Sequence, residues 1–307
     1  MSTSVSEVVA TLAQRYVRHA PVPAGKALLV SRYLNRHLRE HPRRRVTGTE
    51  FGARVAVDTQ DLIQRYLYLF GVWEPHMTGW LQRRLRPGDT YVDVGANIGY
   101  YTLLAAQLVG NEGRVVAIEA SPVFHQRLLR NVALNEYCNV RAINGAVSDK
   151  EETLTFVLAS SANMGANSIV PYAGPAESTF EATARPLPDL LTKDEVRQAR
   201  VIKVDVEGAE GSVMRGMARM LPLLRHDAEI TVEVTPDRMA QLGDSVDELM
   251  ETMEAHGFHP YRLVNDYAPE SYPAALHGAA RVPERLHGPI TGESDLIFSR
   301  VDAETLP

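Results

Sequence analysis

The sequence has 307 residues, of which 45% are hydrophobic and 23% are charged, and its formal net charge is −6. This composition is typical of a folded globular chain and excludes an intrinsically disordered one. A net negative chain has no general attraction to nucleic acid, so we expect no nucleic-acid partner.

The chain contains a single cysteine, Cys138, which cannot form an internal disulfide. This favours a reducing, cytoplasmic location. Residues Met1 to Ala10 have no basic run followed by an apolar stretch, so we expect no secretory signal. No segment approaches about 18 uninterrupted apolar residues, so we expect no membrane span.

Residues 1–70 are predicted to form an N-terminal helical extension. Apolar residues recur at helical spacing over Val5–Val17 and over Lys26–Leu38. Phe51–Val57 alternates like a strand, and Asp58–Phe70 is predicted to be a helix capped by Asp58 or Thr59.

The segment from Arg15 to Arg45 is rich in arginine and histidine. One interpretation is a solvated helical face. The other is a docking surface for an acidic partner or acceptor. The sequence leaves both open.

Residues 71–307 are predicted to form the main domain, in which short β-branched runs alternate with helical stretches. This alternation predicts βαβ units, and therefore an α/β fold with a doubly wound, mostly parallel sheet. The predicted strands are Tyr91–Val94, Val115–Ile118, Val140–Asn144, Val201–Val206, Ile230–Val234 and Leu296–Ser299, and the predicted helices are Tyr100–Val109, Val123–Leu134 and Ser245–His256, the last closed by Gly257.

An insertion of about residues 148–199 interrupts this alternation. It contains an alternating run, Thr153–Leu158, followed by a Gly/Ser/Asn-rich loop through Ala173. We interpret it as an inserted hairpin and a loop near the mouth of the site. Loops over the carboxyl edge of such a sheet usually carry specificity.

A glycine loop, Asp93-Val-Gly-Ala-Asn-Ile-Gly99, follows the first of these strands. Gly95 and Gly99 allow a tight turn and the close approach of a ligand to the backbone. Asn97 stands where the dinucleotide fingerprint needs its second glycine, and would crowd a pyrophosphate. Asp93 suits a cationic ligand carrying an amino group and a sulfonium; the alternative is that it only caps the turn.

Glu119 ends the second strand, where a carboxylate can accept hydrogen bonds from two ribose hydroxyls. This position serves NAD and S-adenosylmethionine equally well, so Glu119 supports an adenosine ligand without choosing between them. The alternative is an exposed loop carboxylate.

The fourth strand carries Lys203, Asp205 and Glu207 at every second position, which places them on one face. Charges on a buried central strand are costly unless they are paired or functional. If the strand ends near Asp205, Glu207 already lies in the following loop. A structural ion pair between Lys203 and a carboxylate is the alternative to a functional role.

Together these strings resemble the FkbM-type methyltransferase family over roughly Gly71 to Val234. The strings that carry the resemblance are Asp93-Val-Gly-Ala-Asn-Ile-Gly99, Glu119-Ala-Ser-Pro122, Asn131 to Asn135, Leu187-Pro-Asp-Leu-Leu191 and Lys203-Val-Asp-Val-Glu-Gly-Ala-Glu210, with Gly71 to Glu74 ahead of the first strand.

The resemblance implies a class I, Rossmann-like methyltransferase fold with seven strands, one of them antiparallel near the C-terminus. It implies S-adenosylmethionine as cofactor and a hydroxyl acceptor on a small molecule, sugar or glycan. A homodimer is compatible with it. The cofactor-binding residues it implies are Glu74, Asp93, Gly95, Ala96, Asn97, Gly99, Glu119, Ser121, Asn144 and Ala146.

Methyl transfer to an alcohol needs alignment and removal of the hydroxyl proton. Asp205 is our first candidate for that task and Glu207 the second, while Lys203 keeps Asp205 ionised. Asp205 and Glu233 could instead hold Mg²⁺, since hard cations favour carboxylates. The aromatic run Tyr66, Tyr68, Phe70 and Trp73 is interpreted as core rather than an acceptor platform.

Two other functions fit parts of the pattern. An NAD(P)-dependent oxidoreductase is disfavoured by Asn97 and by the charged fourth strand. A catalytically silent module that only binds an adenosine ligand is disfavoured because the loop strings are intact.

Overall fold

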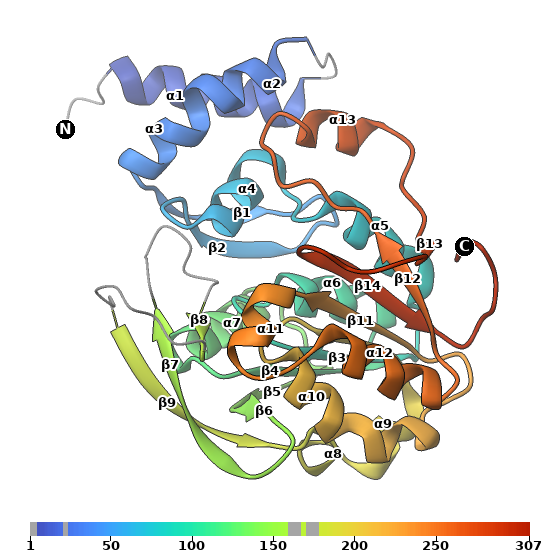
Figure 1. Ribbon diagram of the computed structural model, residues 1–307. Helices are drawn as coiled ribbons and strands as arrows, with labels where there is room; N and C mark the ends of the chain where they lie inside the picture. Colours follow the sequence, from blue (N-terminus) through green and yellow to red (C-terminus); the bar gives the residue numbers. More distant parts are fainter. Residues whose placement is uncertain (1–4, 21–23, 159–166, 170–177) are drawn as a thin grey trace.

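The computed structural model describes residues 5–20, 24–158, 167–169 and 178–307 (Figure 1). A layer of N-terminal helices lies over a large mixed sheet with helices on both faces, and a second, smaller sheet lies beside it. No helix among the described residues is long and apolar enough to cross a membrane.

The N-terminal extension is mainly helical, as predicted, but it also contains a β-hairpin. Asp61, rather than Asp58 or Thr59, caps the helix that follows: its carboxylate accepts a hydrogen bond from Gln64 N at 3.0 Å, whereas Asp58 still belongs to the strand. The elements are α1 (Val5–His19), α2 (Lys26–Leu29), a π-helical turn (Val30–Leu34), α3 (Asn35–Glu40), β1 (Arg44–Gly48), β2 (Arg54–Asp58) and α4 (Leu62–Phe70).

Two arginines of the basic N-terminal segment face inward. The guanidinium of Arg43 is buried and contacts the Glu7 carboxylate at 2.8 Å and the Tyr68 hydroxyl at 2.9 Å. Arg18 donates to the carbonyl groups of Leu67 and Gly48. These residues join α1 to the hairpin and to α4, so they belong to neither a solvated face nor a docking surface.

The central sheet has the strand order β13-β12-β14-β11-β10-β3-β4-β5. Strands β11, β10, β3, β4 and β5 are parallel, and β14 runs antiparallel between β11 and β12. Seven of these strands match the expected sheet, and the two-residue β13 adds an eighth at the edge. The bounds are β3 (Thr90–Val94), β4 (Arg114–Glu119), β5 (Val140–Asn144), β10 (Ala199–Val204), β11 (Glu229–Val234), β12 (His259–Leu263), β13 (Glu284–Arg285) and β14 (Ser294–Ser299).

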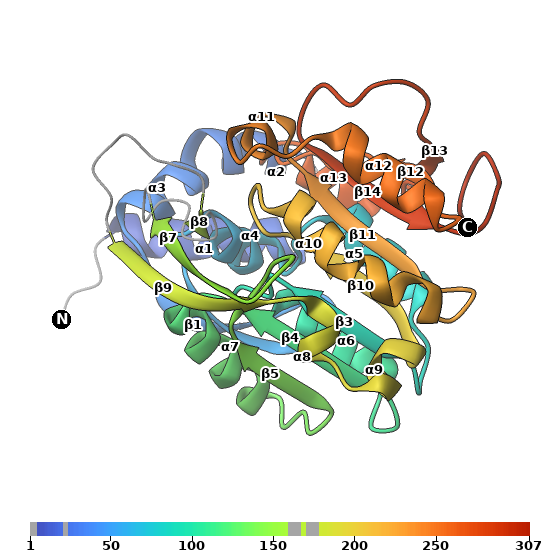
Figure 2. The same cartoon turned by 60° about the horizontal axis from the view of Figure 1, so that its bottom comes forward.

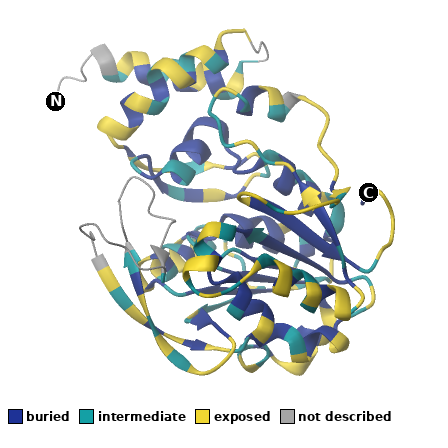
Figure 3. Cartoon of the chain, viewed as in Figure 1, coloured by how far each residue is buried: buried dark blue, intermediate teal, exposed yellow. Residues whose placement is uncertain are grey.

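Helices cover both faces of this sheet, and the interior is buried on both sides (Figure 3). Successive residues of β3 show why: Tyr91 packs with α5, α6 and the N-terminal helices, whereas Val92 packs with α10 and α12 on the opposite face. The helices are α5 (Pro75–Arg84), α6 (Tyr100–Val109), α7 (Pro122–Leu134), α8 (Leu187–Leu190), α9 (Lys193–Gln198), α10 (Glu210–Met217), a 3₁₀ helix (Ala218–Leu223), α11 (Pro236–Gln241), α12 (Val246–Ala255) and α13 (Tyr272–His277).

The fourth parallel strand is shorter than predicted. Strand β10 ends at Val204, not Val206, so Asp205 and Glu207 lie in the loop after it. A side chain at Gly95 would collide with the carbonyl oxygen of Asp205, which shows that this loop packs tightly on the glycine loop. Only Lys203 of the three charged residues is on the strand.

The insertion forms a sheet of its own, with the order β6-β9-β7-β8 (Figure 2). The predicted hairpin is confirmed as the antiparallel pair of β7 (Glu152–Leu158) and β9 (Ser178–Arg185), in which Phe156 is opposite Phe180. Strands β6 (Ala146–Val147) and β8 (Asn167–Ser168) flank it. The Gly/Ser/Asn-rich loop through Ala173 lies largely outside the described residues.

The C-terminal segment returns to the N-terminal helices. Helix α13 packs against α5 and α2, and Tyr66 Oη donates to the carbonyl oxygen of Tyr267 at 3.0 Å. The boundary expected near residue 70 stays a prediction, since one hydrophobic core joins the helices on its two sides.

Candidate active site

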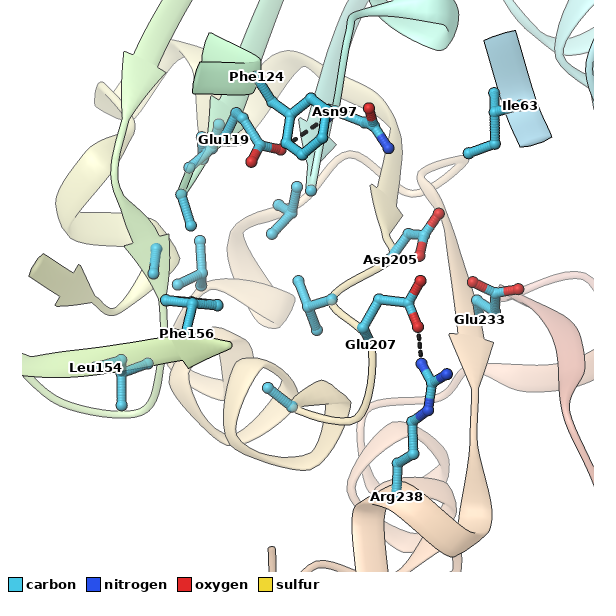
Figure 4. A pocket seen from close by; sticks show the side chains of 18 of the residues that line it. Ile63, Asn97, Glu119, Phe124, Leu154, Phe156, Asp205, Glu207, Glu233 and Arg238 are labelled. Atoms are coloured by element: carbon cyan, nitrogen blue, oxygen red, sulfur yellow. Dashed lines mark hydrogen bonds and ion pairs between the residues drawn. The ribbon is translucent and has the colours of Figure 1, made fainter. Parts of the chain in front are cut away.

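A cavity of about 320 Å³ opens at the carboxyl ends of β3, β4, β10 and β11, the edge where doubly wound sheets bind ligands (Figure 4). Its volume is at the lower end of the range for small-molecule sites. Its lining comprises Leu62, Ile63, Trp73, Glu74, Val94, Gly95, Asn97, Ile118, Glu119, Ala120, Phe124, Gly145, Ala146, Val147, Leu154, Phe156, Asp205, Val206, Glu207, Ala209, Glu233, Arg238, Tyr267 and Glu293.

The glycine loop forms one wall of this cavity. Asn97 has φ 51°, a left-handed conformation that asparagine tolerates better than most residues. Its backbone N–H donates to Glu119 Oε2 at 2.8 Å, which ties the loop to the tip of β4. Gly99, with φ 90°, starts α6, and a side chain there would collide with Leu128. Gly95 and Asn97 therefore line the cavity, and Gly99 shapes the turn.

Asp93 is buried beside this wall, and the described lining of the cavity does not include it. Its carboxylate accepts a hydrogen bond from Thr102 Oγ1 at 2.6 Å. Burial raises the pKa of Asp93 to about 6, although Lys203 acts in the opposite direction. A direct role toward a cationic ligand stays a prediction. Ala96 packs in a small core with Ala117 and also stands outside the described lining.

Glu119 points into the cavity from the tip of β4. Its two carboxylate oxygens accept from Asn97 N and Ser121 N, each at 2.8 Å. Burial raises the pKa of Glu119 to about 7, although these two backbone donors favour the ionised form. Each oxygen keeps a lone pair for a further donor, so the geometry fits a pair of ribose hydroxyls.

Three other predicted cofactor residues surround this strand tip. The Asn144 amide donates to the carbonyl oxygens of Glu119 and Ala120 at 2.9 and 3.1 Å. Ser121 caps α7. Ala146 lines the cavity itself. Asn144 and Ser121 thus position the backbone, and Ala146 is placed to contact a ligand.

Glu74 lies at the opposite end of the cavity, between two tyrosines. It accepts a hydrogen bond from Tyr267 Oη at 3.0 Å and another from Tyr101 Oη. Its φ of 42° is in the left-handed region, which costs about 1–3 kcal/mol in a non-glycine residue. Burial raises the pKa of this carboxyl, while Lys203 lowers it. Such backbone strain is typical of functional sites.

Lys203 and Asp205 form the ion pair that the strand-four pattern suggested. Lys203 Nζ lies 2.6 Å from Asp205 Oδ2 and 5.0 Å from the centroid of the Tyr101 ring. Burial alone would raise the pKa of Asp205, but Lys203 and a hydrogen bond with Glu233 hold it below its usual value. Burial and repulsion by Asp205 raise the pKa of Glu233 well above its usual value. Asp205 is therefore the ionised member of this carboxyl pair, and Glu233 carries the proton.

Glu207 also faces the cavity, where it forms an ion pair with Arg238 (Figure 4). Its φ of 58° and the φ of 113° at Gly208 make the loop turn sharply. Glu210 stabilises this turn by accepting from Gly208 N at 2.9 Å. Asp205 and Glu207 are thus presented by one constrained loop.

Three carboxylates, those of Glu74, Glu233 and Asp295, have oxygens within 4.8 Å of one another, a spacing that suits a shared metal ion. The hydroxyl of Tyr267 lies among them, 3.0 Å, 3.4 Å and 3.5 Å from these three carboxylates in turn. The expected magnesium pair, Asp205 and Glu233, is adjacent, but Lys203 already neutralises Asp205. A metal requirement stays a prediction to be tested.

Several lining residues were not predicted from the sequence. Trp73 is buried in the core together with Tyr66, Tyr68 and Phe70, as expected, but it also lines the cavity, where it stacks on Tyr267 with ring centroids 5.5 Å apart. No sequence pattern points to Tyr267, which lies far along the chain from the motifs. Phe124, Leu154 and Arg238 were also not predicted. An apolar residue, or an arginine in an ion pair, has the same sequence pattern in a core as in a binding site.

The sequence is similar to known methyltransferase families and proteins. The model of the family described as methyltransferase FkbM domain matches residues 93–260. The chain is also 29% identical over 106 residues to an arsenite methyltransferase of Halobacterium salinarum, covering 34% of this chain and 25% of that protein. It is 36% identical over 73 residues to a protein-L-isoaspartate O-methyltransferase of Ignicoccus hospitalis, covering 23% and 35%. The chain thus spans roughly a quarter to a third of the length of these relatives.

Solved structures with similar folds include Aeropyrum pernix fibrillarin in complex with S-adenosyl-L-methionine, at 12% identity and a TM-score of 0.42, covering 83% of this chain and 82% of that one. Another is a structure titled putative rRNA-methylase from Clostridium thermocellum, at 11% identity and a TM-score of 0.45, covering 74% and 94%.

The family match covers more than half of the chain, and it includes the glycine loop, Glu119 and the loop that carries Asp205. This match favours a methyltransferase over the nicotinamide oxidoreductase, one of the alternatives left by the sequence. The chain belongs to the FkbM methyltransferase domain family.

Proposed function

We propose that this protein is an S-adenosylmethionine-dependent methyltransferase, and that it transfers the methyl group to a hydroxyl oxygen of a small molecule, sugar or glycan. The observation that carries the proposal is Asp205, an ionised carboxylate that faces the cavity and is held by Lys203 and Glu233. Hydroxyl groups need such a partner, because an alcohol is a poor nucleophile while it keeps its proton.

Bound S-adenosylmethionine supplies an electrophilic methyl group on a sulfonium. The protein has to align the acceptor oxygen and accept its proton. As the new carbon–oxygen bond forms and the carbon–sulfur bond breaks, the proton passes to the Asp205 carboxylate. Lys203 stabilises the ionised form of Asp205 beforehand, and Glu207, paired with Arg238, is the second candidate.

The acceptor end of the cavity combines polar and aromatic surfaces. Trp73 and Tyr267 stack on each other there, and Ile63 contributes an apolar edge on the same side as Asp205 (Figure 4). Aromatic faces beside hydrogen-bonding carboxylates suit a ring that bears hydroxyl groups. This supports a compact hydroxylated acceptor.

A methyl-transfer assay with labelled S-adenosylmethionine tests the proposal. Hydroxylated sugars and polyketide-like alcohols would be compared with matched compounds in which one hydroxyl is replaced by an amine, a carboxyl or hydrogen. We expect label in the alcohols, with the product stable to mild base as an ether is. Transfer confined to amines or carboxyls would overturn the proposal.

A further inference from the structure

The cavity has two chemically different ends. At one end lie Glu74, Asp205, Glu207 and Glu233, the carboxylates considered above. At the other end lies Glu119, and the side chains beside it, Phe124, Leu154 and Phe156, are apolar. Figure 4 shows Phe124, Leu154 and Phe156 on the Glu119 side of the cavity and Asp205, Glu207, Glu233 and Arg238 on the other.

Glu119 gives the cofactor a direction within this cavity. A carboxylate at the tip of β4 is placed for the two ribose hydroxyls. This inference rests on the proposed function, in which the reacting end of the cofactor lies near Asp205 and the glycine loop. The base then extends from the ribose to the opposite, apolar end. A purine is a flat ring with apolar faces, and such a ring binds well between aliphatic and aromatic side chains.

Two side chains of this apolar end come from the inserted sheet. Leu154 and Phe156 are two residues apart on β7, so they share one face of the strand. Phe156 stacks on Phe180 of β9, with ring centroids 5.0 Å apart and an angle of 3° between the rings.

The backbone also joins the inserted sheet to the cofactor site. Strand β6, Ala146–Val147, pairs with β9, and both of its residues line the cavity. Ala120, next to Glu119, packs against a small core that consists of Ala146, Phe156, Ala182 and Ala184. The inserted sheet and the tip of β4 therefore form one continuous wall.

We propose that the inserted sheet is part of the cofactor site, and that Leu154 and Phe156 form the apolar wall that binds the adenine base. The sequence predicts only that a loop of this insertion lies near the mouth of the site, where loops usually carry specificity. The apolar side chains of the insertion lie at the end of the cavity away from Asp205, so the insertion selects the purine and leaves the acceptor to the Trp73 and Tyr267 side.

Calorimetric titration of the ligand-free protein with S-adenosylhomocysteine tests this without any acceptor. We expect Phe156→Ala to weaken binding roughly 10-fold to 100-fold and Leu154→Ala roughly 5-fold to 20-fold, because apolar contact with the base is lost. Methylthioadenosine keeps only the base, the ribose and the thioether. The affinity of each variant for methylthioadenosine should fall by the same factor as its affinity for S-adenosylhomocysteine. Thr155→Ala is the matched control, because Thr155 is exposed on the other face of β7.

The result is independent of which acceptor the enzyme uses. Unchanged affinity for both ligands in Leu154→Ala and Phe156→Ala, with melting temperatures like that of the unmodified protein, would overturn the proposal. If Phe156→Ala unfolds, Leu154→Ala and Phe156→Leu decide: Phe156→Leu keeps apolar volume without the aromatic face and should lose roughly 3-fold to 10-fold. Both ligands carry the adenine base. A variant that binds S-adenosylhomocysteine more weakly but methylthioadenosine as tightly as the unmodified protein would therefore also contradict the proposal that this wall binds the base.

Discussion

Lys203 and Asp205 meet at the end of β10, with Nζ and Oδ2 2.6 Å apart, across the boundary between the interior and the cavity. The lysine side chain is 6% exposed, whereas that of Asp205 is 28% exposed. Lys203 is therefore enclosed by the protein interior, whereas the carboxylate of Asp205 can reach a ligand in the cavity. This division allows their roles to be separated by mutation.

Asp205→Asn should separate cofactor binding from chemistry. Asparagine keeps the size of the side chain but cannot accept the acceptor's proton. We expect turnover to fall by about 10²–10⁴, the usual effect of losing a general base, with S-adenosylhomocysteine affinity within a few-fold of normal. Single-turnover methyl transfer and calorimetry measure the two quantities.

Glu207→Gln tests the second candidate for the base, since Glu207 lies on the same loop and also faces the cavity. It should lower turnover less than Asp205→Asn does. Normal turnover in Asp205→Asn would remove Asp205 from the mechanism. A large loss of melting temperature in that variant would make Asp205 a structural residue.

Lys203→Met should destabilise the fold, because Asp205, Asp93 and Glu74 would lose their buried counter-ion. Breaking a buried pair typically costs about 3–5 kcal/mol. Lys203 has a raised pKa, so it is charged throughout pH 5–9. The loss of unfolding free energy in the variant should therefore depend on the ionisation of these carboxyls. It should be smaller at pH 5, where they take up protons, than at pH 8.

Denaturant unfolding at both pH values measures this effect. Lys150→Met is the control, because Lys150 forms an exposed pair with Glu152 at 3.6 Å, and exposed pairs contribute about 0–1 kcal/mol. Equal losses of unfolding free energy in the two lysine variants would show that the Lys203 charge contributes little to stability.

The main sheet could be predicted from the sequence because the residue preferences of its strands and helices favour the same structure as their burial in the core. Val140–Asn144 and Tyr100–Val109 have the predicted ends, and Gly257 follows the last long helix as expected. The prediction was wrong at Val206, because the alternating charges continue the strand pattern into a loop. It was also wrong at Asp58, because Asp61 is an equally good cap and the backbone reaches helical geometry only after it.

The candidate site could be predicted where a residue type is unusual for its position. Glu119 and Asp205 are acidic residues beside apolar strands, and both line the cavity. Trp73, Tyr267 and Phe156 could not be found in that way, since an aromatic residue is equally expected in a core. Tyr267 reaches Glu74 only because α13 returns to the N-terminal helices, a contact between residues 193 positions apart.

Activity should persist in the presence of a chelator such as EDTA. The Lys203 ammonium already neutralises Asp205, and the Tyr267 hydroxyl occupies the space among Glu74, Glu233 and Asp295. We therefore expect methyl transfer to change less than two-fold after chelation and dialysis. Loss of activity that Mg²⁺ restores would instead assign a metal-binding role to Asp205 and Glu233.

Cofactor affinity should increase from pH 6 to pH 8, because ionised Glu119 is the better acceptor for ribose hydroxyls. Burial raises the pKa of Glu119 from 4.5 to about 7 in the ligand-free protein. At pH 6 about a tenth of the carboxyls are ionised, so S-adenosylhomocysteine should bind roughly ten-fold more weakly than at pH 8 and release a proton on binding. Calorimetry in buffers with different ionisation enthalpies measures both effects.

The same shift predicts an opposite trend for the ligand-free fold. A carboxyl whose pKa is higher in the folded state favours folding when it is protonated, and this contribution is lost as the pH rises from 4.5 through about 7. Glu119→Gln should abolish both trends and weaken cofactor binding by about 1–3 kcal/mol. Glu254→Gln, a change at an exposed residue of α12, should leave both trends in place. If Glu119→Gln kept the pH dependence of the unmodified protein, another group, with Asp93 the first candidate at a pKa of about 6, would be responsible.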